Sequence, residues 1–551
     1  MSVRSEISRA IDDARDRAAS SGALAIGQET DLPPIVLERP ANPDHGDWAS
    51  NVAIQLAPVA RTTPIRIAET LLEHFDPPVS VAEVSVAAPG FLNFRLDPAW
   101  VAAQVGPIRD AGRVYGRGTA AQPQRINVEF VSANPTGPLH VGNARGAFVG
   151  DVLSRVLDAA GHDVTREYYF NDFGGQVKAL GASVRAIRQG SPLPEDGYRG
   201  DYVGEMAASV PDGVARDAEA AEPDEADWIY GRWASEVQRE GIEASLDALG
   251  VHFDVWKTES SVHDDGWVTR GVERLREAGY VFEEDGATWF RSTAFGDDRD
   301  RVIFRSNGQP TYFAADIGYV SEKFSRGFDE LIYVWGENHH GAVARLLHAA
   351  SALGHDPEAV RILLYSWVRF VRDGEAVSMS KRSGEFVTLD DLVAEVGADP
   401  VRWFFSSRAF TSGIDFDLEL AKRQSHENPV YYVQYAHARA SSILRNASEV
   451  GAAPDSSRTA QLLTHPSEQG LVRHLLDFPD AVGMAADRRE THEVPRYAYE
   501  LASAFSAFYR DCKVLTEDAG LSAARLALVD ATRSVLSNAL ALLGISAPDS
   551  M

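Results

Sequence analysis

The sequence of 551 residues has little cysteine, little lysine and no long apolar run. Cys512 is the single cysteine, which excludes an intrachain disulfide and a cysteine-based zinc site. No apolar stretch of about 18 residues is present, so we expect no transmembrane helix. The residues after Met1 lack the basic and then apolar profile of a signal peptide. With 44% apolar and 24% charged residues, the chain is expected to be a globular cytoplasmic enzyme.

Positive charge is scarce, and nearly all of it is arginine. The chain has six lysines and a net charge of -27. Because polyanions are bound through Lys and Arg, this balance disfavours nonspecific nucleic-acid binding but leaves room for a specific site with local basic groups. Residues 421–551 carry 13 Lys+Arg and 15 Asp+Glu, whereas the first 420 residues carry a net charge of -25. A polyanion would therefore meet the least repulsion in the C-terminal region.

Periodicity divides the chain into three parts. Residues 1 to about 110 combine a helix over 3–20 with strand-like residues 80–96, which turn at Pro89-Gly90 and predict a small α+β domain. From about 120 to 420 strand and helix patterns alternate, as in a parallel sheet, with an interruption at about 180–300. The acidic run at 217–227 inside it is expected to be a solvated loop. Residues 421–551 show helical periodicity, with Asn428 as an expected N-cap and Pro429 at the first helical position.

The most informative segment is 127–143, which reads NVEFVSANPTGPLHVGN. An apolar strand ends in a turn-rich loop, and His140-x-Gly-Asn then opens an amphipathic helix that Gly161 can end. Backbone N–H groups and the helix dipole at such a start favour an anion, and a histidine can add a donor to a phosphate. A histidine in place of the glycines of a dinucleotide loop indicates adenylate chemistry. Taken alone, the motif fits a helix-capping histidine as well.

A second motif, Val377-Ser-Met-Ser-Lys-Arg-Ser-Gly384, lies at the end of the same α/β region. Nucleotidyl transfer needs positive charge where pyrophosphate leaves, and a lysine in a polar loop can supply it. A basic surface loop is the alternative for this motif taken alone. Together, the two motifs resemble the signature pair of the class I aminoacyl-tRNA synthetases.

Further motifs along nearly the whole chain resemble the bacterial arginyl-tRNA synthetases; they occupy 89–94, 128–137, 169–176, 428–439 and 541–551. The resemblance implies a Rossmann-type catalytic domain at 120–420, an N-terminal tRNA-binding domain at 1–110 and a helical anticodon-binding domain at 421–551. It also implies a monomer that activates L-arginine with ATP to arginyl-adenylate and passes it to the terminal ribose of tRNA-Arg. Mg²⁺ would accompany ATP, and no zinc is expected.

The resemblance also assigns roles to individual residues. Arginine would be held by Ser132, Asn134, Tyr312, Asp316 and His339, with Glu129 as a second acid. This fits the chemistry, because a carboxylate can accept two parallel N–H groups of the planar guanidinium. Tyr312 and Asp316 would share one face if they lie on a helix. Catalysis would rest on the side chains of His140, Asn143, Lys381 and Arg382.

The ATP-binding motif implied by the resemblance comprises Ala133, Asn134, Pro135, Thr136, Gly137, Pro138, Leu139, His140, Val141, Gly142, Asn143, Ser378, Met379, Ser380 and Lys381. Two positions depart from the family pattern: Asn143 stands where a histidine is common, and Ser378 stands where a lysine is expected. A catalytically inactive, synthetase-like tRNA-binding protein is therefore one alternative. A different small-molecule adenylyltransferase is another, although it would not need the helical C-terminal region.

Four residues are candidate tRNA contacts by the same resemblance: Phe91 and Asn93 for the tRNA elbow, and Tyr435 and Met551 for the anticodon loop. Tyr432, Gln434 and His437 lie on the same expected helix as Tyr435 and also carry groups suited to unpaired bases. The alternative for the aromatic residues is packing inside the domain.

Overall fold

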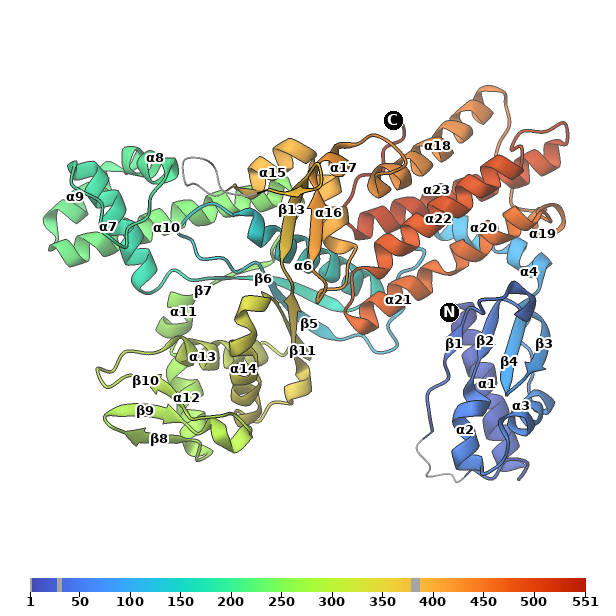
Figure 1. Ribbon diagram of the computed structural model, residues 1–551, viewed down its shortest axis with the longest axis horizontal. Helices are drawn as coiled ribbons and strands as arrows, with labels where there is room; N and C mark the ends of the chain where they lie inside the picture. Colours follow the sequence, from blue (N-terminus) through green and yellow to red (C-terminus); the bar gives the residue numbers. More distant parts are fainter. Residues whose placement is uncertain (1, 27–31, 378–386) are drawn as a thin grey trace.

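The computed structural model describes residues 2–26, 32–377 and 387–551. Figure 1 shows an N-terminal part with a small sheet of its own, a central part around a parallel sheet, and C-terminal helices that lie beside both. A helical lobe, α7–α10, projects from the far end of the central part. This arrangement confirms the expected fold class, an α/β core with an α+β N-terminal part and a helical C-terminal part.

The N-terminal part packs α2 and α3 on an antiparallel sheet, and α1 packs on α3. α1 covers 3–20, as the sequence predicts, and Ser2 Oγ caps it by accepting a hydrogen bond from Ser5 N–H (3.2 Å). The strands pair in the order β1-β2-β4-β3, and β3 and β4 form the hairpin expected at 80–96. The elements are α1 (Val3–Ser20), β1 (Leu37–Glu38), β2 (Trp48–Ser50), α2 (Val52–Ala60), α3 (Pro64–Glu73), β3 (Val81–Ala87) and β4 (Phe91–Leu96).

The two short helices after β4 pack with the C-terminal helices instead of the N-terminal sheet. α4 (Pro98–Ala103) contacts α19 and α20, and α5 (Val105–Ala111) contacts α23. Residues 98–110 are expected in the N-terminal domain, but they pack with the helical part.

The central sheet is parallel and has the strand order β12-β11-β5-β6-β7. Its strands are β5 (Arg125–Phe130), β6 (Asp163–Phe170), β7 (Val255–Thr258), β11 (Glu330–Gly336) and β12 (Val360–Tyr365). From β5 the chain first adds β6 and β7 on one side, and it then returns to add β11 and β12 on the other. In such sheets, ligands bind outside the carboxyl ends of the two adjacent strands at which the strand order reverses. The topology therefore places a binding site after β5 and β11.

The interruption expected at 180–300 is not continuous. Residues 175–248 form the helical lobe, which has an apolar core of its own, but β7 then pairs with β6 and belongs to the central sheet. The lobe consists of α7 (Gly175–Gln189), α8 (Asp201–Ser209), α9 (Asp212–Ala220) and α10 (Pro223–Ala248). The prediction of a solvated loop at 217–227 is wrong, because most of this run lies in α9 and α10.

Pairing with α7 explains why part of the acidic run is ordered. Lys178 reaches Asp224, and Arg185 Nε donates to Asp227 Oδ1 at 2.7 Å.

A second apolar core lies beneath the other side of the sheet. It is built from elements that follow β7: α11 (Glu259–Asp264), α12 (Trp267–Glu277), β8 (Val281–Glu284), β9 (Ala287–Phe290), β10 (Arg301–Phe304), α13 (Tyr312–Ser325) and α14 (His340–Ala352).

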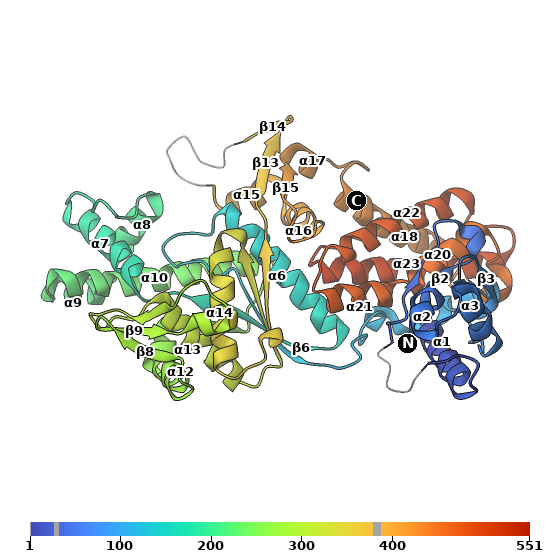
Figure 2. The same cartoon turned by 60° about the horizontal axis from the view of Figure 1, so that its bottom comes forward.

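α6 (Val141–Ala160), the helix after the first motif, is buried along most of its length. It contacts α16 and α21, and Figure 2 shows it between the central sheet and the C-terminal helices. Gly161 ends it with φ 104°, in the left-handed region that glycine adopts without strain. The remaining central elements are β13 (Val368–Arg372), β14 (Glu375–Ala376), α15 (Leu389–Val396), α16 (Ala398–Ser406), β15 (Ile414–Asp417) and α17 (Leu418–Lys422).

The C-terminal part is helical, as expected. Its first helix, α18, begins after Asn428, but that side chain does not cap it: the amide donates to the Ala421 and Arg423 carbonyl groups, both at 3.0 Å. The helices are α18 (Pro429–Glu449), α19 (Thr459–Leu462), α20 (Pro466–Leu476), α21 (Phe478–Arg488), α22 (Glu493–Asp511) and α23 (Ala519–Leu542). Among all the helices described, none is long and apolar enough to cross a bilayer.

Candidate active site

The chain turns sharply where β5 ends, at the point that the sheet topology marks as a binding site. Val131 and Ser132 have φ angles of 66° and 42°, in the left-handed region that a β-branched residue such as valine rarely adopts. The turn is held by Ser132 Oγ, which accepts from Tyr169 N–H and donates to Glu129 Oε1, both at 3.1 Å. Strained backbone that neighbouring contacts hold in place is common at ligand sites.

His140 is the N-cap of α6, so the capping role left open by the sequence is real. Its Nδ1 accepts from Gly142 N–H (2.9 Å), and Asn143 Oδ1 accepts from His140 N–H (3.3 Å). Burial lowers the pKa of His140, so the ring is neutral at pH 7. A neutral ring whose Nδ1 accepts carries its proton on Nε2. Capping thus occupies Nδ1 and puts the ring proton on Nε2, so a helix cap and a phosphate donor are compatible roles for His140.

A cavity of about 560 Å³ lies beside the first turn of α6. Gly142 lines it from α6, Asn338 from the segment after β11, and Trp367 from the connection between β12 and β13. Its volume is within the range of about 300–1,000 Å³ usual for small-ligand pockets. A larger cavity of about 1150 Å³ lies between α1, residues 114–119 and α21, but it contains no residue of either motif. The smaller cavity is therefore the better match to a nucleotide.

Ser378, Met379, Ser380, Lys381 and Arg382 of the second motif lie outside the described residues. The chain on either side of them is described and lies at the same site. Val377 lines the 560 Å³ cavity and donates its N–H to Phe370 O (2.9 Å). On the other side, Leu389 N–H donates to Leu139 O (2.8 Å), and Thr388 forms a β-bridge with His140. The two motifs are thus joined through these flanks.

Acidic side chains from three elements meet near the carboxyl edge of the sheet: Glu129 on β5, Glu259 on α11 and Asp316 on α13. Burial raises the pKa of Asp316 to about 7; the Arg345 guanidinium opposes this rise, and the carboxylates of Glu259 and Glu129 add to it. A cation bound here would favour the ionised form of Asp316. The cluster is therefore acidic, with Arg345 as the cation already beside Asp316.

Glu129 already forms an ion pair and a hydrogen bond inside the protein, and these contacts bear on its predicted role as an arginine ligand. Lys323 Nζ donates to Glu129 Oε2 at 2.6 Å, and Ser132 Oγ donates to Oε1 at 3.1 Å. Both Glu129 and Lys323 are buried. With both oxygens engaged inside the protein, Glu129 is poorly placed to accept a guanidinium directly.

Glu259 was missed by the sequence analysis. It is buried at the start of α11, directly after β7, and its surroundings are fixed by Asp172, which accepts hydrogen bonds from Ser260 N–H (2.9 Å) and Ser260 Oγ–H (2.5 Å). The available signal was an acid at the carboxyl end of a strand, in Val255-Trp-Lys-Thr-Glu259. It was overlooked because that strand fell inside the expected interruption.

The other predicted arginine ligands lie at the same edge but are more open to solvent. Tyr312 begins α13 and is 68% exposed, one helical turn before Asp316, as the spacing predicts. Asn134 Nδ2 donates to Gln176 Oε1 of α7 at 2.7 Å. His339 is exposed in the short 3-10 helix after β11. These three side chains are exposed, whereas Glu129 and Glu259 are buried.

The predicted tRNA contacts separate into exposed and buried residues. Phe91 is partly exposed on β4, whereas Asn93 is 6% exposed in the same strand and is closed to a large partner. Tyr435 and Met551 are exposed. The Arg439 guanidinium carbon lies 4.7 Å from the Tyr435 ring centroid, so an aromatic ring and a cation share this surface.

Neighbours of Tyr435 on α18 bind the end of the chain instead. Gln434 Nε2 donates to Ser546 O (3.0 Å), His437 Nδ1 lies 2.9 Å from Pro548 O, and Ser441 Oγ donates to Asp549 Oδ1 (2.8 Å). Gln434 and His437 are therefore packing residues, and Tyr435 is the exposed member of the set.

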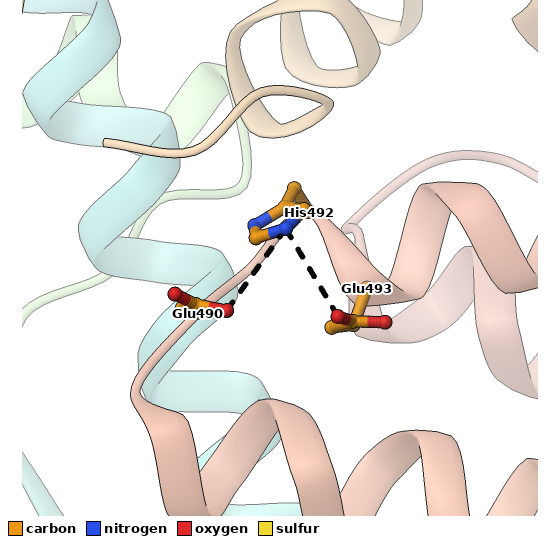
Figure 3. A group of neighbouring side chains, drawn as sticks. All are labelled: Glu490, His492 and Glu493. Carbon is orange, nitrogen blue, oxygen red and sulfur yellow. Dashed lines mark ion pairs between the residues drawn. The ribbon is translucent and has the colours of Figure 1, made fainter. Parts of the chain in front are cut away.

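A group of three side chains at the turn between α21 and α22 has the composition of a metal site. Figure 3 shows His492 between Glu490 and Glu493, with Nε2 at 3.9 Å and 4.0 Å from their carboxylate oxygens. Glu493 also pairs with Arg488 (3.7 Å) and with Arg496. Because these arginines already neutralise Glu493, and His492 lies between the two carboxylates, we interpret the group as an ion-pair cluster.

Three family descriptions match successive parts of the chain. They are "Arginyl tRNA synthetase N terminal domain" over 1–96, "tRNA synthetases class I (R), catalytic domain" over 110–193 and 232–401, and "DALR anticodon binding domain" over 433–551. A relative from Desulforudis audaxviator, named arginine–tRNA ligase, is 46% identical over 562 residues, which cover 100% of this chain and 99% of the relative. The chain belongs to the arginyl-tRNA synthetase family.

Solved structures of the family share its architecture. The arginyl-tRNA synthetase of Thermus thermophilus matches with a TM-score of 0.78 and 25% identity, covering 100% of both chains. A structure described as a putative arginyl-tRNA synthetase from Campylobacter jejuni matches with a TM-score of 0.75 and 30% identity, covering 83% of this chain and 100% of the other. The catalytic family description skips residues 194–231, which belong to the helical lobe.

Proposed function

We propose that this protein is a cytoplasmic, monomeric arginine–tRNA ligase, which activates L-arginine with ATP and transfers the arginyl group to the 3′-terminal ribose of tRNA-Arg. One observation carries the proposal: the acid cluster around Asp316 and the helix start at His140 meet at the carboxyl edge of one parallel sheet. The first can hold a guanidinium and the second can hold a phosphate.

In this proposal the substrate guanidinium binds Asp316, with Glu259 adding negative charge nearby. Tyr312 lies one turn before Asp316 and closes over the substrate. Ser132, Asn134 and His339 hold its amino and carboxylate groups. A ligand without a guanidinium would leave Asp316 without this contact, which is a basis for rejection. Glu129 acts indirectly, because it holds the Ser132 hydroxyl while its own charge is balanced by Lys323.

ATP accompanied by Mg²⁺ occupies the cavity beside α6 in this proposal. The arginine carboxylate attacks the α-phosphate, pyrophosphate leaves, and arginyl-adenylate forms. His140 Nε2–H and the N-terminus of α6 stabilise charge on the reacting phosphate, while Asn143 holds the His140 backbone. Lys381 and Arg382 supply positive charge for the pyrophosphate. No side-chain nucleophile is needed, because positioning and electrostatics supply the rate enhancement.

For the transfer step we propose a separate role for each of three parts of the chain. Residues 120–420 carry the chemistry, residues 1–110 contact the tRNA elbow through Phe91, and residues 421–551 contact the anticodon loop through Tyr435 and Met551. The near-neutral charge of the last part is compatible with this role.

The deciding experiment is arginine-dependent ATP–pyrophosphate exchange, measured with and without tRNA. Exchange with arginine supports the proposal. No exchange even with tRNA present would refute an enzymatic role and favour a tRNA-binding protein without activity. Exchange with lysine but not arginine would refute the assigned specificity. Light scattering at the assay concentration measures the molar mass and so tests whether the protein is a monomer.

A further inference from the structure

The helical lobe α7–α10 touches the loop that joins β5 to α6, residues 131–139. Its apolar core is separate from the other two cores of the described residues. The catalytic family description skips residues 194–231 of this lobe. The family description therefore does not account for a contact from residues 194–231 to the loop 131–139, which carries predicted arginine and ATP ligands.

Tyr202, near the start of α8, makes this contact. Its Oη donates a hydrogen bond to Thr136 O at 2.9 Å. Its ring also lies against Gly137, because a Cβ placed on that glycine would be 3.3 Å from Oη and 3.4 Å from Cζ. Burial raises the pKa of Tyr202 to about 12, with Tyr198 contributing, so the hydroxyl keeps its proton at physiological pH.

The two ends of the loop are held by other parts of the protein. At its start, Tyr168 Oη donates to Ala133 O (2.9 Å). At its end, Leu389 N–H donates to Leu139 O (2.8 Å). Between these anchors, within the part of the chain that the structure describes, Tyr202 fixes the carbonyl of Thr136. The residues that flank this point are Asn134 and His140, whose spacing must suit an amino acid and a phosphate at once.

We propose that Tyr202 is a positioning residue for the activation step: it holds Thr136 and Gly137 so that the arginine ligands before them and His140 after them keep their relative placement. This inference rests on the proposed function. Tyr202 need not touch either substrate, because it acts on the backbone between their binding residues. Misplacing reacting groups by about 1 Å can lower a rate about 100-fold, so a smaller displacement should still lower kcat.

The test compares Tyr202→Phe, which removes only the hydroxyl, with Val203→Ala. Val203 is the next residue on α8 and is fully buried in the lobe core, so its truncation loosens the lobe without removing the contact to the loop. We expect Tyr202→Phe to lower kcat for arginine-dependent exchange by about 3- to 10-fold, the range of one lost hydrogen bond, with smaller changes in KM. Val203→Ala should lower Tm and leave kcat near the wild-type value.

Hydrogen–deuterium exchange of residues 131–139 separates this inference from the proposed function, because it needs no activity. Tyr202→Phe should speed exchange in that segment, and Val203→Ala should speed it in the lobe alone. Unchanged exchange of 131–139 and unchanged kcat in Tyr202→Phe would overturn the inference. An equal loss of kcat in Val203→Ala would also overturn it. A wild-type protein without activity but with the expected deuterium pattern would refute the function and leave the loop contact standing.

Discussion

Lys323 and Glu129 form an ion pair in the interior of the central part, with Nζ 2.6 Å from Oε2. Lys323 Nζ also lies 4.5 Å and 4.1 Å from the ring centroids of Tyr319 and Tyr333. A cation is thus enclosed by two aromatic faces and one carboxylate. Because Lys323 is on α13 and Glu129 is on β5, the pair fixes the helix that carries Asp316 to the strand that leads into the nucleotide loop.

Lys323→Met should destabilise the protein strongly. Methionine fills much of the same space but leaves Glu129 buried without its cation. Breaking a buried pair from one side costs about 3–5 kcal/mol, and we expect the free energy of unfolding of the central part to fall by that amount in urea denaturation.

The matched control for this loss is Lys422→Met. Lys422 pairs with Glu395 and Glu419 at the surface, and exposed pairs contribute about 0–1 kcal/mol. The double variant Lys323→Met/Glu129→Gln should recover part of the loss, because no buried charge is left unpaired. Equal stability of Lys323→Met and Lys422→Met would contradict the role of the buried pair.

The KM for arginine should rise as pH falls below about 7. Burial raises the pKa of Asp316 to about 7, and the proposed guanidinium contact needs the carboxylate. Apparent affinity scales with the ionised fraction, so KM should increase about tenfold between pH 8 and pH 6. The KM for ATP, measured in the same exchange assay, is the internal control. An arginine KM that stays flat across this range would exclude Asp316 as the titrating ligand.

The same carboxyl group has an opposite effect on the unliganded fold. Between pH 3.8 and about 7, native Asp316 holds a proton that the unfolded chain has lost. Stability falls with rising pH where the native state binds more protons. Asp316 therefore destabilises the free protein as pH rises through this window. Because arginine pairs with the carboxylate, saturating arginine should raise Tm more at pH 8 than at pH 5.5.

Replacing His140 can separate capping from catalysis. Asparagine is a good N-cap, so His140→Asn should keep Tm close to the wild-type value, whereas His140→Ala loses the cap as well. Asparagine cannot place a donor where Nε2–H lies. We expect kcat for exchange to fall about 100- to 1,000-fold in both variants, as when one donor to a developing charge is removed. Near-normal kcat in His140→Asn would show that His140 is only a cap.

Local patterns were enough to predict several elements. The helix over 3–20 and the hairpin at 80–96 follow from residues close in sequence, and so does the end of α6 at Gly161. The strand at Val255–Thr258 was not predicted, because four residues with a lysine among them carry no clear alternation. Its place in the sheet depends on pairing with β6, far back in the chain. Glu259, which follows that strand, was lost for the same reason.

The first motif indicated His140, and the family resemblance assigned Asp316 to the same site, but neither defined the partners of the acids around Asp316. Glu129 was expected, from the family resemblance, to be a second acid for arginine. Its actual partner, Lys323, comes from a helix nearly 200 residues later, and no local pattern indicates such a contact. On α18, positions 434, 437 and 441 share one helical face. That they hold residues 546–549, and leave Tyr435 exposed, depends on where the chain ends in space.

Tyr435→Ala should weaken binding of tRNA-Arg without affecting the chemistry. Its ring is 39% exposed, and it lies beside Tyr431, with ring centroids 6.2 Å apart, and beneath the Arg439 guanidinium. Stacking of one base on an aromatic side chain contributes about 1–3 kcal/mol, so we expect the Kd for tRNA to rise about 5- to 150-fold at fixed salt. Tyr435→Phe keeps the π-face and should change Kd much less.

The control for the tRNA prediction is Val450→Ala, an exposed site at the end of the same helix. It should leave Kd unchanged in a filter-binding or fluorescence titration. At saturating tRNA, Tyr435→Ala should give normal kcat for ATP–pyrophosphate exchange, because the ring lies on α18 and not in the catalytic part. A Kd equal to that of Val450→Ala would remove Tyr435 from the tRNA surface. A loss of kcat at saturating tRNA would instead indicate that this surface is coupled to the activation step.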